Sequence, residues 1–359
     1  MGSAGSGFAQ RLELVHHMQE FTFRELTEGE LFDPNTLSQG TPFTQAAFYG
    51  DWQRHLGKRV RRFTASTEGK VMAYFQIIKY PLLSGKSYLY APYGPVVKNP
   101  SDEIFRTLKA ELARIAQEEN AVFVRLDFTP HVPTETLSKF FTTAPPFTYH
   151  SSYFQPRTEW FLPLQKSEYD LLSDMHKHTR YSIRLAGERG VTVEIVTKDF
   201  KTYFDSFYAL MVETAKRNGF NLHPKKYYEG IFESLDGIAA YLSVARFEDT
   251  ILAVNLIIVY GGVASHIFGG SSSDERHRMP AYLAQWDSIR HAKLLGCTDY
   301  NFGGISTDSG VYKGWEGLTS FKKKFGGRKV VHSDFFDLVT RPLWYHLYNI
   351  RKRLKSAGL

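Results

Sequence analysis

The most informative hydrophobic pattern in this 359-residue chain lies between residues 251 and 304. Residues 251–260 form a nearly unbroken apolar run, which predicts a central strand buried on both faces. Gly261 and Gly262 permit a tight turn, so residues 263–269 should return as its antiparallel partner. A polar loop follows, and a helix should then run from Pro280 to Gly296 before a short strand at residues 300–302. Its recurring apolar positions are Ala281, Leu283, Trp286, Ile289, Ala292 and Leu295.

The first half of the chain repeats this order of elements. Strands are predicted at residues 59–65, 70–80 and 87–93, and two prolines and a glycine then break the sheet. A helix at residues 101–118 begins with Ser101 as its N-cap, and a buried strand is predicted next at residues 121–128. No sequence identity links the two halves, so we infer an architectural repeat of one α+β fold. The proline-containing residues 129–149 are expected to connect the copies.

Helices dominate the opening of the second half. A strand at residues 157–164 leads to a Ser-capped helix and then to a basic helix that ends at Gly190. Lys177, Arg180 and Arg184 should face outward on this basic helix, either as a phosphate-binding surface or as an ordinary solvated face. No sustained heptad pattern follows, so a long coiled-coil arm is not expected.

Composition narrows the classes of function. The chain is 43% hydrophobic with a net charge of +7, so it should fold into globular domains and attract polyanions such as tRNA. The lone Cys297 excludes a disulfide framework, and the histidines lack metal-ligand spacing. Residues 1–7 have the texture of a cloning scar, and no apolar run reaches the length of a membrane span. A cytoplasmic protein is the default expectation.

Two stretches together resemble a known family. They are "P-A-Y-L-A-Q-W-D-S-I-R-H-A-K-L-L-G-C-T-D-Y-N-F-G-G-I" and "S-F-K-K-K-F-G-G". Both are similar to the FemABX family of aminoacyl-tRNA-dependent peptidyltransferases. The resemblance implies an α+β fold of two tandem GNAT-like domains without a coiled-coil arm, the first at residues 8–156 plus 335–359 and the second at 157–334. It also implies transfer of an aminoacyl group from charged tRNA to an amine of a peptidoglycan-precursor stem peptide.

The resemblance also suggests catalytic residues. Phe321, Lys322, Phe325 and Gly326 match the family's F-K-x-x-F-G signature, and Lys322 would stabilise the oxyanion formed when an amine attacks the aminoacyl ester. On structural grounds alone, the two phenylalanines would be core and the lysines a solvated edge. Asp127 lies where the family has a carboxylate, although a structural acid at a strand end fits equally well. The catalytic candidates are Lys322, Phe321 and Asp127.

Substrate contacts are expected in both halves. At the end of a helix over residues 204–218, Arg217 matches the family's diphosphate-binding cation, and the alternative is a cation that offsets the helix dipole. The candidate substrate-binding residues are Arg54, Tyr93, Lys216, Arg217, His266 and Phe268. The candidate tRNA-binding residues are Lys177, Arg180, Arg184, Lys323 and Lys324.

Other interpretations remain open. The loop at residues 271–279 lacks the glycines with which acetyl-CoA enzymes cradle pyrophosphate, so we expect no cofactor. A GNAT-type N-acyltransferase with another donor, or a non-enzymatic protein that binds RNA or the precursor, would fit the same fold. We expect a monomer.

The chain ends in an amphipathic helix. Its apolar positions are Leu343, Trp344, Leu347, Ile350 and Leu354. We expect this face to pack on the first domain, and peripheral contact with the inner membrane surface is the alternative.

Overall fold

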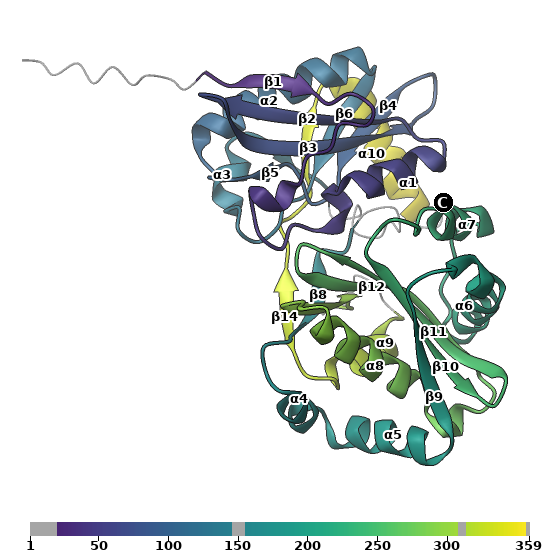
Figure 1. Ribbon diagram of the computed structural model, residues 1–359. Helices are drawn as coiled ribbons and strands as arrows, with labels where there is room; N and C mark the ends of the chain where they lie inside the picture. The colour runs from purple at the N-terminus through teal and green to yellow at the C-terminus, as the bar shows by residue number, and fades with distance from the viewer. Residues whose placement is uncertain (1–19, 146–154, 308–313, 357–359) are drawn as a thin grey trace, which may run out of the picture.

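The computed structural model describes residues 20–145, 155–307 and 314–356. Figure 1 shows two bodies, each built on its own sheet. The first strand in the described part of the chain is β1 (Thr22–Glu25).

The first sheet has the strand order β1-β2-β3-β4-β6-β15-β7, with β5 paired to β3. Its other strands are β2 (Val60–Thr67), β3 (Lys70–Pro81), β4 (Ser87–Ala91), β5 (Val96–Val97), β6 (Ala121–Leu126), β7 (Thr142–Thr143) and β15 (Phe336–Val339). The helices of this body are α1 (Ala47–His55), α2 (Asp102–Glu118), α3 (Thr134–Ser138) and α10 (Pro342–Ser356). The segment predicted as a plain connection therefore contributes α3 and β7.

The second sheet has the order β14-β8-β13-β12-β11-β10-β9. Its strands are β8 (Thr158–Pro163), β9 (Val191–Val196), β10 (Ala240–Phe247), β11 (Thr250–Tyr260), β12 (Val263–Ser271), β13 (Asp299–Gly304) and β14 (Arg328–Val331). The accompanying helices are α4 (Glu168–Asp174), α5 (Lys177–Glu188), α6 (Phe204–Asn218), α7 (Lys225–Glu233), α8 (Pro280–Leu294) and α9 (Glu316–Lys323).

The two sheets repeat one topology, which confirms the predicted fold class. In the first, β4 and β6 are parallel neighbours joined through α2, and in the second β12 and β13 are parallel neighbours joined through α8. Next to β6 lies β15 from the end of the chain, in the position that β8 takes beside β13. We propose the domain limits 8–156 plus 335–359 and 157–334, which this exchange of strands supports.

Local sequence explains the two central helices. The Ser101 hydroxyl accepts a hydrogen bond from the Ile104 amide at the start of α2 (3.4 Å), and α8 begins with Pro280 at its first turn. Gly296 follows α8 with φ +77°, a conformation that favours glycine. Leu295, predicted on the buried face, is exposed because α8 ends at Leu294 and the chain turns away.

An apolar cluster joins the two bodies. Trp52 of α1 and Ile78 of β3 pack in one cluster with Phe207 of α6, Tyr228 of α7 and Leu256 of β11. The cluster is buried, so the two bodies share a hydrophobic contact.

The prediction for the C-terminal helix was wrong in its orientation. Helix α10 packs on the first sheet through Tyr345 and Tyr348, whose rings lie 5.3 and 4.9 Å from that of Phe123. The Tyr345 hydroxyl donates to Asp337, which forms a fully buried pair with Arg125. A tyrosine can bury its ring and still satisfy this polar pair, whereas leucine cannot, so the apolar face points away from the sheet.

Candidate active site

The candidate site begins where β12 and β13 separate. Their parallel pairing runs from Val263–Asp299 to Ser265–Asn301 and does not extend to the following described residues. On its other side β12 pairs with β11 through a bulge, since Leu256 faces Phe268 while Ile257 faces His266. A bulge redirects side chains, and here it coincides with the opening between the two strands.

Lys322 enters this opening from α9. Its ammonium donates a 2.6 Å hydrogen bond to the Gly304 carbonyl, and the residue is 6% exposed. Gly303, next to the bonded carbonyl, has φ +77°, a conformation that favours glycine. Burial lowers the pKa of Lys322 to about 8, while Glu159 opposes that shift. This lysine is therefore not part of a solvated edge.

His266 lies beside the same opening. Its Nε2 is buried and has no hydrogen-bond partner among the described residues. A Cβ on Gly269 would come within 2.6 Å of this atom, so glycine leaves the space that the ring occupies. Burial, with the charge of Lys322, lowers the pKa of His266 to about 3, and the ring is neutral near pH 7. It can act as a hydrogen-bonding group there.

Asp127 takes the matching position in the first sheet. It follows β6 directly and forms an isolated bridge with Gly94, where the chain passes from β4 to β5. The Tyr93 amide donates to one carboxylate oxygen (2.6 Å) and the Tyr90 hydroxyl to the other (3.0 Å). Burial raises the pKa of Asp127 to about 7 against the effect of these hydrogen bonds, so the carboxyl is poised to exchange a proton near neutrality.

A buried polar chain connects the two sheets. His332 Nε2 lies 2.8 Å from Glu159 of β8, and the Asn301 amide donates to the other Glu159 oxygen (3.0 Å). The His332 ring lies 4.3 Å from that of Tyr93, whose hydroxyl donates to the Pro156 carbonyl (2.6 Å). The negative charge of Glu159 also raises the pKa of Lys322, against the effect of burial. The surroundings of Lys322 and Asp127 are thus linked through Glu159, His332 and Tyr93.

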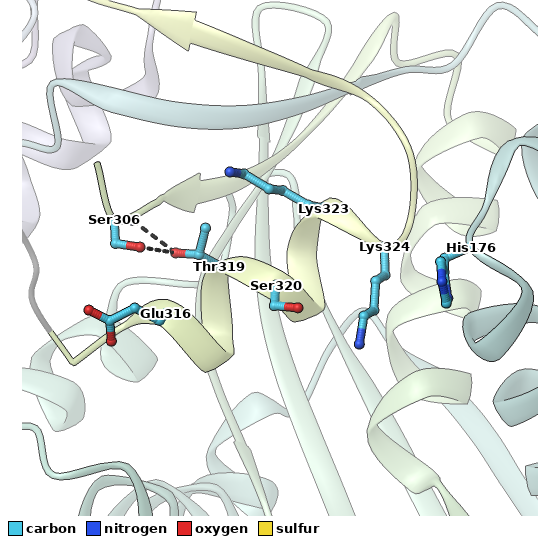
Figure 2. Close-up of a pocket in the computed structure, with 7 residues that line it drawn as sticks. All are labelled: His176, Ser306, Glu316, Thr319, Ser320, Lys323 and Lys324. Atoms are coloured by element: carbon cyan, nitrogen blue, oxygen red, sulfur yellow. Dashed lines mark hydrogen bonds between the residues drawn. The ribbon is translucent and has the colours of Figure 1, made fainter. Parts of the chain in front are cut away.

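An open pocket of about 380 Å³ lies on another side of α9. It is lined by His176, Ser306, Glu316, Thr319, Ser320, Lys323 and Lys324. Figure 2 shows Lys324 extending between α9 and His176, while Lys323 points in a different direction. Two hydrogen bonds from Ser306 to the Thr319 hydroxyl, 2.8 and 2.9 Å long, hold the chain after β13 against the helix. This pocket has a basic rim, and the Lys322 ammonium is directed elsewhere.

The remaining tRNA candidates lie along α5. The His176 amide at its start donates to the Lys324 carbonyl (2.9 Å), so exposed Lys177 comes close to the pocket rim. Arg180 donates to carbonyls at the end of α4, including Ser173 at 2.9 Å, and Arg184 pairs with Glu188 at 3.3 Å. The structure therefore places Lys323 and Lys324 at one pocket, with Lys177 next in the chain to the lining residue His176, and gives Arg180 a structural contact.

Arg217 at the end of α6 is held by several protein groups. Its guanidinium donates to the carbonyl and hydroxyl of Ser271 and to the Ser273 hydroxyl, at 2.9 to 3.0 Å. It thereby fixes the chain that leaves β12. The neighbouring Lys216 is exposed, and Arg54 on α1 pairs with Asp51.

Two aromatic candidates lie in apolar surroundings. Phe321 packs between Tyr282 and Phe325, with ring centroids at 5.0 and 5.1 Å. Phe268 packs against Tyr228 of α7 at 5.1 Å, beside the apolar cluster that joins the sheets. Phe321 therefore belongs to the aromatic packing between α8 and α9, and Phe268 to the packing between β12 and α7.

Sequence reasoning missed Glu159, His332 and Tyr90. The signal for Glu159 was an acid inside an otherwise strand-like run, which normally requires a buried partner. His332 carried no comparable signal, because its partner is 173 residues away along the chain. Among the described residues, no group of three or more His, Cys, Asp or Glu side chains is arranged to hold a metal ion.

Comparison with known proteins agrees with this architecture. The sequence-family model described as an acetyltransferase (GNAT) domain matches residues 173–314. A lipid II:glycine glycyltransferase of Staphylococcus aureus is 23% identical over an alignment covering 88% of this chain and 92% of the relative. The crystal structure of FemX superposes with a TM-score of 0.77 at 21% identity, covering 90% of this chain and 99% of that one.

The chain is therefore similar over most of its length to FemX and to a lipid II:glycine glycyltransferase. A tandem GNAT protein from the clavulanic acid biosynthesis pathway also matches, with a TM-score of 0.50, 11% identity and coverage of 89% of this chain and 98% of its own. The matched domain and these structural neighbours show that the two sheets have a tandem GNAT-like fold.

Proposed function

We propose that this protein transfers an aminoacyl group from aminoacyl-tRNA to an amine of the stem peptide of a peptidoglycan precursor, as a member of the FemABX family would. The observation that carries the proposal is the buried Lys322 ammonium at the opening between β12 and β13, in a chain similar over most of its length to a lipid II:glycine glycyltransferase. Because charged tRNA is the donor, the reaction would take place in the cytoplasm.

The proposed chemistry is aminolysis of an activated ester. The acceptor nitrogen bonds to the ester carbonyl carbon, and the bond from that carbon to the tRNA ribose oxygen breaks. The proton lost by the acceptor amine ends on this oxygen, which leaves as a hydroxyl. The Lys322 ammonium stabilises the negative charge that develops on the carbonyl oxygen. No covalent enzyme intermediate is required, since the ester is already reactive and correct positioning supplies much of the acceleration.

The acceptor amine must lose a proton during transfer. We assign this proton to Asp127, whose raised pKa of about 7 suits exchange near neutrality. Both carboxylate oxygens are already hydrogen-bonded, and the Tyr90 hydroxyl that contacts one of them also accepts from the Gln155 amide at 3.1 Å. The proton would therefore reach Asp127 through Tyr90. A purely structural acid at this position is the competing assignment.

The basic rim of the pocket supports the role of tRNA as donor. Lys177, Lys323 and Lys324 come from α5 and the end of α9, next to the helix that carries Lys322. Cations at this place would bind phosphates near the charged end of the tRNA while its ester reaches the other side of α9. We assign the acceptor side to Tyr93, His266 and Phe268 around the opening, and its diphosphate to Lys216 and Arg217, with Arg54 as the next candidate.

The loop between β12 and α8 favours this donor over coenzyme A. A pyrophosphate at this place requires backbone N–H groups that point outward. The Ser273 amide instead donates to the Glu213 carboxylate, and the Asp274 amide donates to the Ser272 hydroxyl at 3.1 Å. The amides of Arg278 and Met279 are likewise used by carbonyls within the loop.

Replacing the donor tests the proposal. We expect ribonuclease treatment of the charged tRNA to abolish transfer, and added acetyl-CoA not to restore it. Product would be followed by mass, with a heat-inactivated ribonuclease as the matched control. Turnover that persists after complete removal of RNA would exclude a tRNA donor and favour a GNAT-type enzyme with another acyl donor.

A further inference from the structure

The outward face of α10 is an apolar ridge. Its members are Leu343, Trp344, Leu347, Ile350 and Leu354, with exposed fractions of 82%, 37%, 56%, 44% and 46%. At 100° per residue these five positions fall within an arc of about 120°. The opposite face is fixed to the first sheet by Tyr345 and Tyr348, so the ridge cannot turn inward without breaking the Tyr345 bond to Asp337.

A neighbouring hairpin extends the ridge. Lys86, in the turn between β3 and β4, places its ammonium 5.6 Å from the Trp344 ring centroid. Leu83 of the same turn is 61% exposed. The Leu82 amide donates to the Lys86 carbonyl at 2.7 Å, which gives the turn a defined shape. Apolar and cationic side chains from two separate elements therefore meet at one surface.

The charged residues of the C-terminal segment that carries the ridge have one sign. Residues 338–359 contain no aspartate or glutamate, whereas they include Arg341, Arg351, Lys352, Arg353 and Lys355. Arg351 and Arg353 are exposed on the helix that carries the ridge. An apolar stripe bordered by cations, with a tryptophan at its edge, is complementary to the surface of an anionic bilayer.

A second copy of the chain fits this surface less well. A symmetric contact through the ridge would place the same cations against each other, with no acid on α10 to pair with them. The ridge is also a single helix face, which is narrow compared with a stable dimer interface of about 800 Å² per partner.

A membrane-spanning helix is a different kind of membrane contact. No helix within the described ranges is long and apolar enough to cross a bilayer.

We propose that α10, with the β3–β4 turn, docks the protein on an anionic lipid membrane, lying in the interface with its ridge in the acyl boundary. The helix would lie parallel to the membrane, with Arg351 and Arg353 at the level of the phosphates. Resting on the proposed function, this docking would bring the site to a lipid-linked acceptor. Binding to lipid requires no turnover, so it is tested separately.

Sedimentation with vesicles tests the docking. The full chain should bind phosphatidylcholine vesicles containing about 30% phosphatidylglycerol, and bind pure phosphatidylcholine vesicles much more weakly. The double variant Leu347→Glu/Ile350→Glu should lose at least about 10-fold in affinity for the anionic vesicles. Its thermal unfolding should match that of the parent, because both side chains are exposed.

A matched control is available elsewhere on the surface. Leu31→Glu/Leu294→Glu changes two leucines that are each 77% exposed and lie outside the ridge, and it should bind vesicles as the parent does. Equal binding by the parent and the ridge variant, or no binding by the parent, would overturn the proposal. Self-association of the parent that the ridge variant loses would assign the ridge to a second copy. If the parent binds anionic vesicles through the ridge but transfers no aminoacyl group, the proposed function fails and the docking proposal stands.

Discussion

At the residue scale, the central feature is a lysine whose surroundings contradict a surface role. The signature pattern singled out Lys322, and the structure shows it buried against the Gly304 carbonyl, while Lys323 next to it is exposed. Adjacent helical positions point in different directions, so two neighbouring lysines have different environments. The pattern could not reveal Glu159 and His332, because their pairing depends on β8 and the segment after β14 meeting in space.

Replacing Lys322 tests its chemical role. Lys322→Met keeps an apolar stem of similar length but removes the ammonium, so turnover should fall about 100-fold or more, equivalent to roughly 3 to 4 kcal/mol of barrier. Acceptor binding and thermal stability should stay near the parent values. Steady-state kinetics of Lys323→Met provides the comparison. Equal, small effects at both positions would remove Lys322 from the reaction, and a large loss at Lys323 alone would mean that the wrong lysine was chosen.

The pH dependence of transfer follows from two shifted groups. Asp127 must be ionised to accept a proton, so the rate should rise through its pKa of about 7. Lys322 must be protonated to stabilise the oxyanion, so the rate should fall as pH rises through about 8. The expected profile is a narrow bell. Asp127→Asn should lower the rate and remove the acidic limb, whereas a structural acid would leave that limb in place.

Glu159→Gln provides a second check on the same profile. Glu159 raises the pKa of Lys322, so removing its charge should move the alkaline limb to lower pH. The amide keeps the size of the side chain and can still accept from Asn301. An alkaline limb that stays in place would show that Glu159 does not act on the titrating group.

At the element scale, the order of strands and helices was predictable, but the orientation of α10 was not. Apolar periodicity located the β11–β12 hairpin and α8, because these elements are buried by their own neighbours in the chain. Helix α10 also shows periodicity, yet its inward face is set by a polar pair, Arg125 and Asp337, that lies 212 residues apart in sequence. An apolar stripe predicts which helix face is buried only when no polar contact fixes a different face of the helix against the protein.

Breaking that pair tests how β15 and α10 are held. Asp337→Ala leaves the Arg125 guanidinium buried without its bidentate partner, so the free energy of unfolding should fall by about 3 to 5 kcal/mol. Asp102→Ala removes an exposed pair with Lys139 and should cost less than about 1 kcal/mol. Both are measured by denaturant unfolding. Similar small losses for the two variants would mean that the buried pair does not anchor the C-terminal segment.

At the scale of the whole molecule, two copies of one fold place their openings toward a common region. Asp127 comes from the end of β6, and Lys322 lies at the end of β13, the equivalent strand in the other sheet. The repeat of one fold could be predicted from the sequence, because both halves show the same order of strands and helices. The polar chain between the two copies could not be predicted, since Tyr93, His332 and Glu159 belong to three separate segments.

The most direct measurement is the mass of the product. The purified protein is incubated with a mixture of charged tRNAs and with nucleotide-linked and lipid-linked peptidoglycan precursors. The account predicts that one precursor gains the mass of a single aminoacyl residue, only when charged tRNA is present, and that Lys322→Met slows this gain. Precursors that keep their mass with every charged tRNA, while the protein is folded and still binds them, would contradict it.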